Sequence, residues 1–298
     1  MLVMSTTRIY RVAELPFRVS CSGEEFLPDK LSNMHPFISG LLPKEEALFT
    51  LEIEYKELPE ASGELIYRTD DGPLFPEISL WKMPGGHISA RTRALPGRPE
   101  AMELDMAPDF ASATLTLPGK EDAFALNNAL MLLFTFASAK MGALEMHASV
   151  VVNRGMGYLF LGKSGTGKST HSSLWLRHIP GTWLLNDDNP VLRLMPSGEV
   201  RVFGSPWSGK TPCYKALSAP AGAVVRLHQA PYNKIERITG VKAYASLMAS
   251  ASSFRPFSAL ADHWHHTLDA MAQAVPCYEL ECLPNEEAAR LCFSTVNG

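Results

Sequence analysis

Apolar and polar residues alternate in short stretches over the first 120 residues of the chain. Leu51, Ile53 and Tyr55 are separated by Glu52 and Glu54, a period of two that is typical of a strand with one buried and one solvated face. Turn-forming sequences rich in Gly, Pro and Asp separate such stretches. The pattern predicts strands at 8–12, 48–55, 63–68, 77–81 and 113–117.

From residue 121 onward, longer apolar runs and helical periodicity replace the short alternation. Helices are expected at 121–140, 170–178, 242–251, 258–274 and 285–296. Strands are expected at 143–152, 159–161, 182–186, 190–194, 199–203, 223–227 and 278–282. Because several of these strands follow one another with no helix between them, the sheet should be mixed. We therefore expect an α/β P-loop nucleotide-binding domain at 121–298, preceded by a β-rich α+β domain at 1–120.

One motif stands where an apolar strand passes into a helix. Residues 162–170 read Gly-Lys-Ser-Gly-Thr-Gly-Lys-Ser-Thr, which satisfies the rule of Gly, four free positions, Gly, Lys and then Ser or Thr. Glycines let successive backbone N–H groups point into one concavity, and the following helix adds its positive end. The sequence thus predicts a phosphate-binding loop made of Gly162, Lys163, Ser164, Gly165, Thr166, Gly167, Lys168, Ser169 and Thr170. Lys168 should reach the β- and γ-phosphates of ATP, and the Ser169 hydroxyl should bind Mg²⁺.

Two carboxylates end the next predicted strand, 182–186. Asp187 and Asp188 follow it directly, and ligands of open α/β sheets bind outside the carboxyl ends of the strands. They are candidates for the metal and for the base that phosphoryl transfer needs. The alternative is a simple turn, since Asp-Asp-Asn-Pro is good turn sequence.

A second loop, 204–212, has glycines at 204 and 209 together with Trp207 and Lys210. A loop of this composition can bring Lys210 and backbone donors close to a phosphate or to an acceptor. A rigid surface turn is the alternative.

Other polar residues carry weaker signals. His147 ends an apolar run fifteen residues before Gly162, where a histidine is usually a core residue. Asp262 and His266 have helical spacing but no third metal ligand. Phosphate partners could come from Arg226, Arg237 or Arg255, and their spacing does not select one. In the first 120 residues, His87 and the pair at 70–71 are expected to be turn residues without a site.

Composition limits the functional classes. The chain of 298 residues has a net charge of −4, which argues against nucleic acid held by bulk electrostatics. Residues 1–120 hold 12 Lys/Arg against 18 Asp/Glu, and the remainder hold 15 against 13. The longest apolar stretch, 129–139, is too short to span a bilayer. Five cysteines without a C-x-x-C pair, and no secretory signal, favour reduced thiols in a cytoplasmic protein. A homo-oligomer is compatible with the sequence.

These motifs resemble the C-terminal domain of HPr kinase/phosphatase, within the HPr kinase and PEP carboxykinase superfamily. The resemblance is carried by His147-Ala-Ser, by the loop at 162–170 and by Leu-Asn before Asp187 and Asp188. It implies that Asp187 is the general base toward a serine hydroxyl, that Asp188 helps to hold Mg²⁺ with Ser169, and that His147 lies near the acceptor phosphate. Residues 1–120 do not resemble the usual N-terminal domain of HPr kinases, so we expect a side branch.

The leading expectation is a kinase that uses ATP and Mg²⁺ to phosphorylate a serine-like hydroxyl on a small molecule, peptide or protein. Lys168 and Lys210 would stabilise the transferred phosphoryl group, and the acidic first domain would recognise the acceptor. Two alternatives stay open at this point. One is a carboxykinase-type reaction, which would need a transition-metal site, and the other is a nucleotide-binding regulator with little turnover.

Overall fold

The computed structural model describes residues 5–22, 27–40, 46–69, 72, 76–119, 122–209, 211–252 and 258–298. The chain divides into two compact units, Met1–Ser138 and Ala139–Gly298. The sequence had placed the boundary at residue 120. The difference arises because helix α1 (Ala123–Ser138) packs on strands of the first unit.

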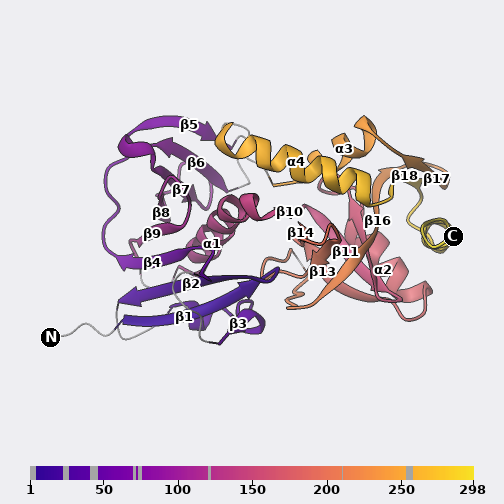
Figure 1. Ribbon diagram of the computed structural model, residues 1–298, viewed down its shortest axis with the longest axis horizontal. Coiled ribbons are helices and arrows are strands. Elements are labelled where there is room, and N and C mark those ends of the chain that lie inside the picture. Colours follow the sequence, from indigo (N-terminus) through magenta and orange to yellow (C-terminus); the bar gives the residue numbers. More distant parts are fainter. Residues whose placement is uncertain are drawn as a thin grey trace. The chain divides into compact units, whose positions relative to one another are not determined.

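The first unit is a nine-stranded sheet with the order β3-β1-β2-β4-β9-β8-β7-β6-β5 (Figure 1). Neighbouring strands are antiparallel except that β4 pairs parallel with both β2 and β9. The strands are β1 (Ser5–Val12), β2 (Leu15–Ser22), β3 (Ile38–Ser39), β4 (Thr50–Tyr55), β5 (Glu64–Arg68), β6 (Glu77–Lys82), β7 (Ile88–Arg93), β8 (Met102–Met106) and β9 (Ser112–Leu117). Short 3₁₀ helices are η1 (Leu27–Lys30), η2 (His35–Phe37) and η4 (Pro84–Gly86).

The core of the first unit lies between α1 and one face of this sheet. Leu51 and Ile53 of β4 are buried, as the alternation predicts, and Phe134 of α1 meets Phe17 with ring centroids 6.2 Å apart. The stretch Ala123–Met141 is long and apolar enough to cross a membrane by composition, but 67% of it is buried within the protein. Helix α1 is therefore a core helix of the first unit, as its sequence predicted.

The second unit is built on a mixed sheet with the order β10-β14-β15-β16-β12-β11-β13, and β18 and β17 continue it beyond β16. The strands are β10 (Ala143–Glu145), β11 (Ala148–Asn153), β12 (Met156–Leu161), β13 (Trp183–Asp188), β14 (Val191–Leu194), β15 (Val200–Phe203), β16 (Ser218–Gln229), β17 (Lys234–Ile238) and β18 (Cys277–Cys282). The helices are η5 (Ala139–Met141), α2 (Lys168–His178), α3 (Val241–Met248), α4 (Ser258–Ala274) and α5 (Glu286–Val296). β16 runs parallel to β12 and β18, while the other pairs are antiparallel, so the mixed α/β sheet expected from the sequence is confirmed.

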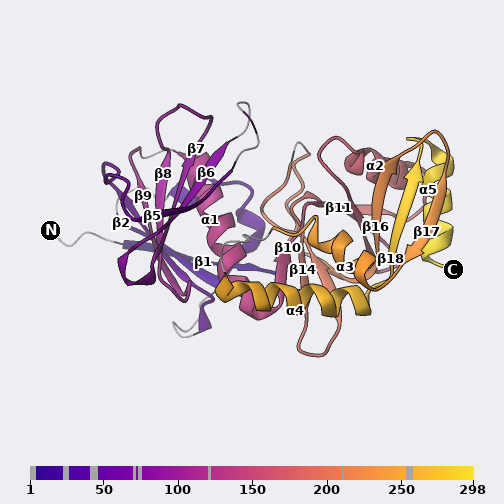
Figure 2. The ribbon, with the colours of Figure 1, turned by 90° about the horizontal axis from the view of Figure 1, so that it is seen from above.

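Helices cover both faces of the second sheet (Figure 2). On one face, Trp175 of α2 and Cys292 of α5 are fully buried in a cluster with Phe160 and Val225. On the other face, α3 is tied to β16 through a hydrogen bond from Arg226 to Ser246. The alternation along β16 therefore directs Val225 and Arg226 to opposite sides.

The stretch 143–152 was expected to be one strand but forms two. β10 pairs with β14, whereas β11 pairs with β12 and β13. Between them, Met146 N donates to Pro190 O (2.9 Å) and His147 N donates to Ser250 O (2.6 Å). The chain thus leaves one set of strands and joins another at His147.

Candidate functional site

Three strand ends meet at one edge of the second sheet. Ala148, the first residue of β11, lies between Leu161 at the end of β12 and Asp188 at the end of β13. On the far side of Leu161, the register places Arg226 of β16. The residues that follow β12 and β13, and the residue that precedes β11, are therefore brought together although they are far apart in sequence.

The loop between β12 and α2 has the backbone that its glycines predict. Gly165 has φ of 79° and Gly167 has φ of 108°, in the left-handed region that favours glycine. Gly167 is the N-cap of α2, and no side-chain hydrogen bond caps it within the part of the chain that is described. The first turn of α2 therefore presents uncapped N–H groups and the positive helix end to the loop.

Lys168 turns its side chain back into this loop. The residue is 8% exposed, and its Nζ donates to Gly162 O at 3.0 Å and to His147 Nε2 at 2.7 Å. Burial lowers the pKa of the Lys168 ammonium; Asp188 and Asp187 oppose this shift, and Arg226 adds to it. The site thus holds a desolvated cation, a suitable partner for a polyanion.

His147 connects Lys168 to Asp188. Its Nδ1 lies 3.1 Å from Asp188 Oδ1, and its side chain is 41% exposed. Because an ammonium group can only donate, Nε2 of the imidazole must accept from Lys168, and a neutral imidazole then carries its proton on Nδ1, the nitrogen that faces Asp188. The hydrogen-bond network in this way assigns a neutral histidine with the proton on Nδ1.

The two aspartates contact different partners. Asp187 Oδ1 accepts a hydrogen bond of 3.0 Å from Ser169 Oγ, whereas Asp188 faces His147. The side chain of Ser169, expected to hold Mg²⁺ together with Asp188, is hydrogen-bonded to Asp187. Asp188 has φ of 123°, a strained conformation for a residue with a side chain, and this turn of the backbone separates the two carboxylates.

The loop that follows β15 lies against the end of β13. Ser208 Oγ donates to Asp187 O at 2.9 Å, and Gly209 N donates to the same oxygen at 2.8 Å. A Cβ atom on Gly209 would lie 3.0 Å from Asp188 Cβ, so a side chain here would press on Asp188 and glycine is favoured. Trp207 is 5% exposed and anchors the loop by packing. Lys210 lies outside the described residues.

Of the three candidate arginines, Arg226 lies beside Leu161 at the edge of the sheet that carries the loop. It is half-buried, and it donates from Nε to Ser246 Oγ (2.9 Å) and from Nη2 to Ser250 Oγ (3.0 Å) and to Ser246 O. Burial lowers the pKa of its guanidinium, against the effect of Glu279. Arg237 is exposed on β17, and residue 255 lies outside the described part of the chain. Only the strand register, which the sequence does not reveal, brings Arg226 to this edge.

Gln229 is a further residue that sequence reasoning missed. From the end of β16, its Nε2 reaches Gly165 O at 3.3 Å and Thr166 O at 3.4 Å. Because Gln229 binds these two carbonyl groups on the outer side of the loop, it favours a backbone conformation in which N–H groups of the loop point into its concave side. No motif marks this glutamine.

These groups line one cleft of about 410 Å³, called the cleft below. Its walls are formed by His147, Ser164, Gly165, Gly167, Lys168, Ser169, Thr170, Asp187, Asp188 and Gly209. Gly162 and Lys163 instead turn carbonyl groups toward Lys168 Nζ, at 3.0 and 3.5 Å. Within the described residues, no three His, Cys, Asp or Glu side chains are grouped to hold a metal, so the pair at Asp262 and His266 stays without a site.

Comparisons with known proteins add little. No protein-family model matches the chain, and no curated protein matches it. One similar solved structure is the Hpr(Ser) kinase/phosphatase from Coxiella burnetii, at 14% identity and a TM-score of 0.29, over 51% of this chain and 88% of that chain. The sequence motifs suggested the same family, but a TM-score of this size carries no argument about function.

Proposed function

We propose that the protein is an ATP- and Mg²⁺-dependent kinase that transfers the γ-phosphoryl group to a serine-like hydroxyl. One observation carries this proposal. A single cleft holds a glycine-rich loop with a buried lysine, a hydroxyl–carboxylate pair at Ser169 and Asp187, and a second carboxylate on His147. These are the parts that phosphoryl transfer needs: a phosphate cradle, metal ligands and a group that takes the acceptor's proton.

The donor side of the cleft fits a nucleotide and its metal. Uncapped N–H groups of α2 and the Lys168 ammonium suit the phosphates. Ser169 Oγ and Asp187 Oδ1, 3.0 Å apart, are hard oxygen ligands of the kind that Mg²⁺ takes alongside phosphates and water. We therefore assign the metal to Ser169 and Asp187, and the bound ion would neutralise charge that develops on the phosphates.

The acceptor side is assigned to His147 and Asp188. In this structure Lys168 Nζ donates to His147 Nε2, so this nitrogen cannot accept another proton. When Lys168 turns to the phosphates, Nε2 is free to take the proton of the attacking hydroxyl. Asp188 Oδ1, the ion-pair partner of Nδ1, then stabilises the imidazolium that forms. The resemblance had implied Asp187 as the base and Asp188 as a metal ligand; the contacts favour Asp187 for the metal and His147, paired with Asp188, for the base.

The two alternatives gain no specific support. A carboxykinase-type reaction needs a transition-metal site, and no group of three or more His, Cys, Asp or Glu side chains that could hold a metal lies among the described residues. A nucleotide-binding regulator would need the loop but has no use for His147 held between Lys168 and Asp188.

The experiment is a transfer assay with γ-labelled ATP. Free serine, serine-bearing peptides and a protein mixture are offered to the wild type and to Asp188→Asn, with Mg²⁺ or with a chelator. Asp269→Asn, an exposed change on α4, is the matched control. We expect Mg²⁺-dependent labelling of at least one acceptor that is lost in Asp188→Asn and kept in Asp269→Asn. Tight binding of Mg²⁺·ATP without transfer to any acceptor would instead support the regulator.

A further inference from the structure

The outer face of the first sheet carries a row of hydroxyl groups on β9. Ser112, Thr114 and Thr116 alternate with Ala113, Leu115 and Leu117, which are buried toward α1. The hydroxyls therefore point to the face opposite the core. Strands β4 and β8 lie on either side of β9.

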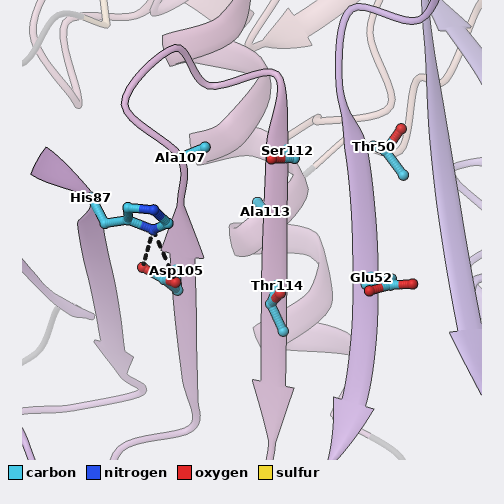
Figure 3. A pocket seen from close by; sticks show the side chains of 8 residues that line it. All are labelled: Thr50, Glu52, His87, Asp105, Ala107, Ser112, Ala113 and Thr114. Atoms are coloured by element: carbon cyan, nitrogen blue, oxygen red, sulfur yellow. Dashed lines mark hydrogen bonds and ion pairs between the residues drawn. The ribbon is translucent and has the colours of Figure 1, made fainter. Parts of the chain in front are cut away.

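Carboxylates flank this row on both sides. On β4, Glu52 is paired with Thr114 and Glu54 with Thr116. On β8, Asp105 is paired with Thr114 and Glu103 with Thr116. Figure 3 shows Glu52, Thr114 and Asp105 on three adjacent strands, with His87 hydrogen-bonded to Asp105 at 3.2 Å. We call the face formed by Ser112, Thr114, Thr116, Glu52, Glu54, Glu103 and Asp105 the acidic trough.

The acidic trough is hollowed rather than flat. A pocket of about 230 Å³ and one of about 630 Å³ adjoin and share His87, Asp105 and Thr114. Six carboxylates line the two pockets among the residues that are described, against Lys56 and His87 as basic groups. Arg91 lies beneath with its side chain 4% exposed, and it is already paired with Glu100 and Glu103. The trough therefore carries excess negative charge.

One hydroxyl in the acidic trough has no partner of its own. Thr116 is 5% exposed and lines the larger pocket, and no described residue supplies a hydrogen bond to its side chain. The hydroxyl itself is not enclosed by protein atoms, so it is open to the larger pocket. A hydroxyl that lies between Glu54 and Glu103 and opens to the pocket can therefore hydrogen-bond a ligand in the trough.

We propose that the acidic trough binds an extended polypeptide segment with Lys or Arg at alternate positions. Along each strand, Glu52 and Glu54, like Asp105 and Glu103, are two residues or about 6.8 Å apart. Alternate side chains of an extended peptide repeat at the same distance. The two rows are separated by two strand spacings, about 10 Å, which is too wide for one metal ion to bridge. The hydroxyl row lies between them and supplies hydrogen bonds to the segment.

This inference is independent of the proposed kinase activity, because binding requires neither nucleotide nor turnover. The probe is a fluorescein-labelled peptide of alternating Lys and Ser, titrated with the full chain in the absence of ATP. Comparison peptides have the same composition with the lysines in one block, or Glu in place of Lys. Spermidine is the competitor that tests for a small polyamine.

Two variants remove the proposed contacts. Glu52→Gln/Glu54→Gln neutralises the carboxylates of one row. The control is Glu64→Gln/Glu236→Gln. It matches the first variant because Glu64 is exposed and Glu236, like Glu54, is paired with a nearby lysine. Thr116→Val replaces the hydroxyl by a methyl group. Because the hydroxyl has no described partner, this change should not lower the melting temperature.

We expect the alternating peptide to bind, with affinity that falls as salt rises. Glu52→Gln/Glu54→Gln should weaken binding at least about fivefold and Thr116→Val about threefold, each factor corresponding to the loss of an ordinary polar contact. The control should bind as the wild type does. Equal affinity for the trough variant and its control overturns the site. If the peptide with its lysines in one block binds equally well, or if spermidine at equal concentration displaces the alternating peptide, the trough is not a site for an extended peptide.

Discussion

Asp187 and Asp188 are adjacent in sequence, and the backbone angle φ of Asp188 directs their carboxylates to different partners. With Asp188 at φ 123°, Asp187 meets Ser169 and Asp188 meets His147. Backbone strain of this kind costs about 1–3 kcal/mol and clusters at functional sites. The strain is maintained by the contact of the two carboxylates with separate partners.

The first prediction separates the two carboxylates. Asp187→Asn should raise the Mg²⁺ concentration needed for half-maximal activity, because it removes a charged metal ligand. Asp188→Asn should leave that concentration unchanged and lower the maximal rate by up to about 10²–10⁴-fold, the usual contribution of general base catalysis, because His147 loses the carboxylate that supports it as the base. Initial rates over a Mg²⁺ titration measure both effects. The reverse outcome, with Asp188→Asn shifting the Mg²⁺ requirement, would restore the assignment that the family resemblance implied.

The sequence predicted the residues whose function depends on their immediate neighbours. The loop at 162–170 is encoded within nine consecutive positions, and Asp187 and Asp188 directly follow their strand. His147 was found only through its resemblance, since its partners Lys168 and Ser250 are distant in sequence. Arg226 and Gln229 depend on how β16 is registered against β12, which residue patterns do not show.

At the scale of elements, the loop after β15 supports the cleft by close backbone approach. Gly209 N donates to Asp187 O, and a side chain at this position would press on Asp188. We predict that Gly209→Ala lowers the rate at least about tenfold, an effect of 1.4 kcal/mol on the barrier, while ATP affinity stays near that of the wild type. Gly119→Ala, where a Cβ meets nothing within 4 Å, is the control. If Gly209→Ala is as active as Gly119→Ala, the loop does not position Asp188.

Helix α3 and strand β16 form a second support. Arg226 binds Ser246 and Ser250, and Ser250 O accepts the backbone N–H of His147. Arg226→Met should therefore lower kcat about tenfold or more, with a smaller change in KM for ATP, because His147 loses its position. Arg237→Met removes the same charge from an exposed site and should have no effect. A loss confined to KM would show that Arg226 contacts the phosphates directly.

Several strands of the first unit escaped sequence reasoning for physical reasons. The hairpin of β1 and β2 turns at Ala13 and Glu14, with φ of 50° and 62°, where glycine or asparagine would normally mark the turn. Strands β7 and β8 carry Arg91 and Glu103, whose burial depends on their mutual ion pair at 2.9 Å. Neither segment alone indicates that its charged residue will be buried against an opposite charge on the neighbouring strand.

At the scale of the whole molecule, each unit has its own core and its own hollow, and the two are assigned different ligands. We predict that Mg²⁺·ATP raises hydrogen-exchange protection in the second unit, around β12, α2 and β13, and leaves the acidic trough unchanged. Saturation at about 100 times the dissociation constant should stabilise the binding unit by about 2.7 kcal/mol. The alternating Lys peptide should protect β4, β8 and β9 instead. Protection of the same segments by both ligands would contradict separate sites.

The central claim is that the cleft binds Mg²⁺·ATP through Lys168, and calorimetry tests it most directly. ATP is titrated into the wild type with and without Mg²⁺, and into Lys168→Met, with Lys140→Met as an exposed control. We predict binding that is strengthened by Mg²⁺, weakened by about 1.5–3 kcal/mol or more in Lys168→Met, as for the loss of a hydrogen bond to a charged group, and unchanged in Lys140→Met. Equal affinity of the wild type and Lys168→Met, or no heat of binding in either, would contradict the account.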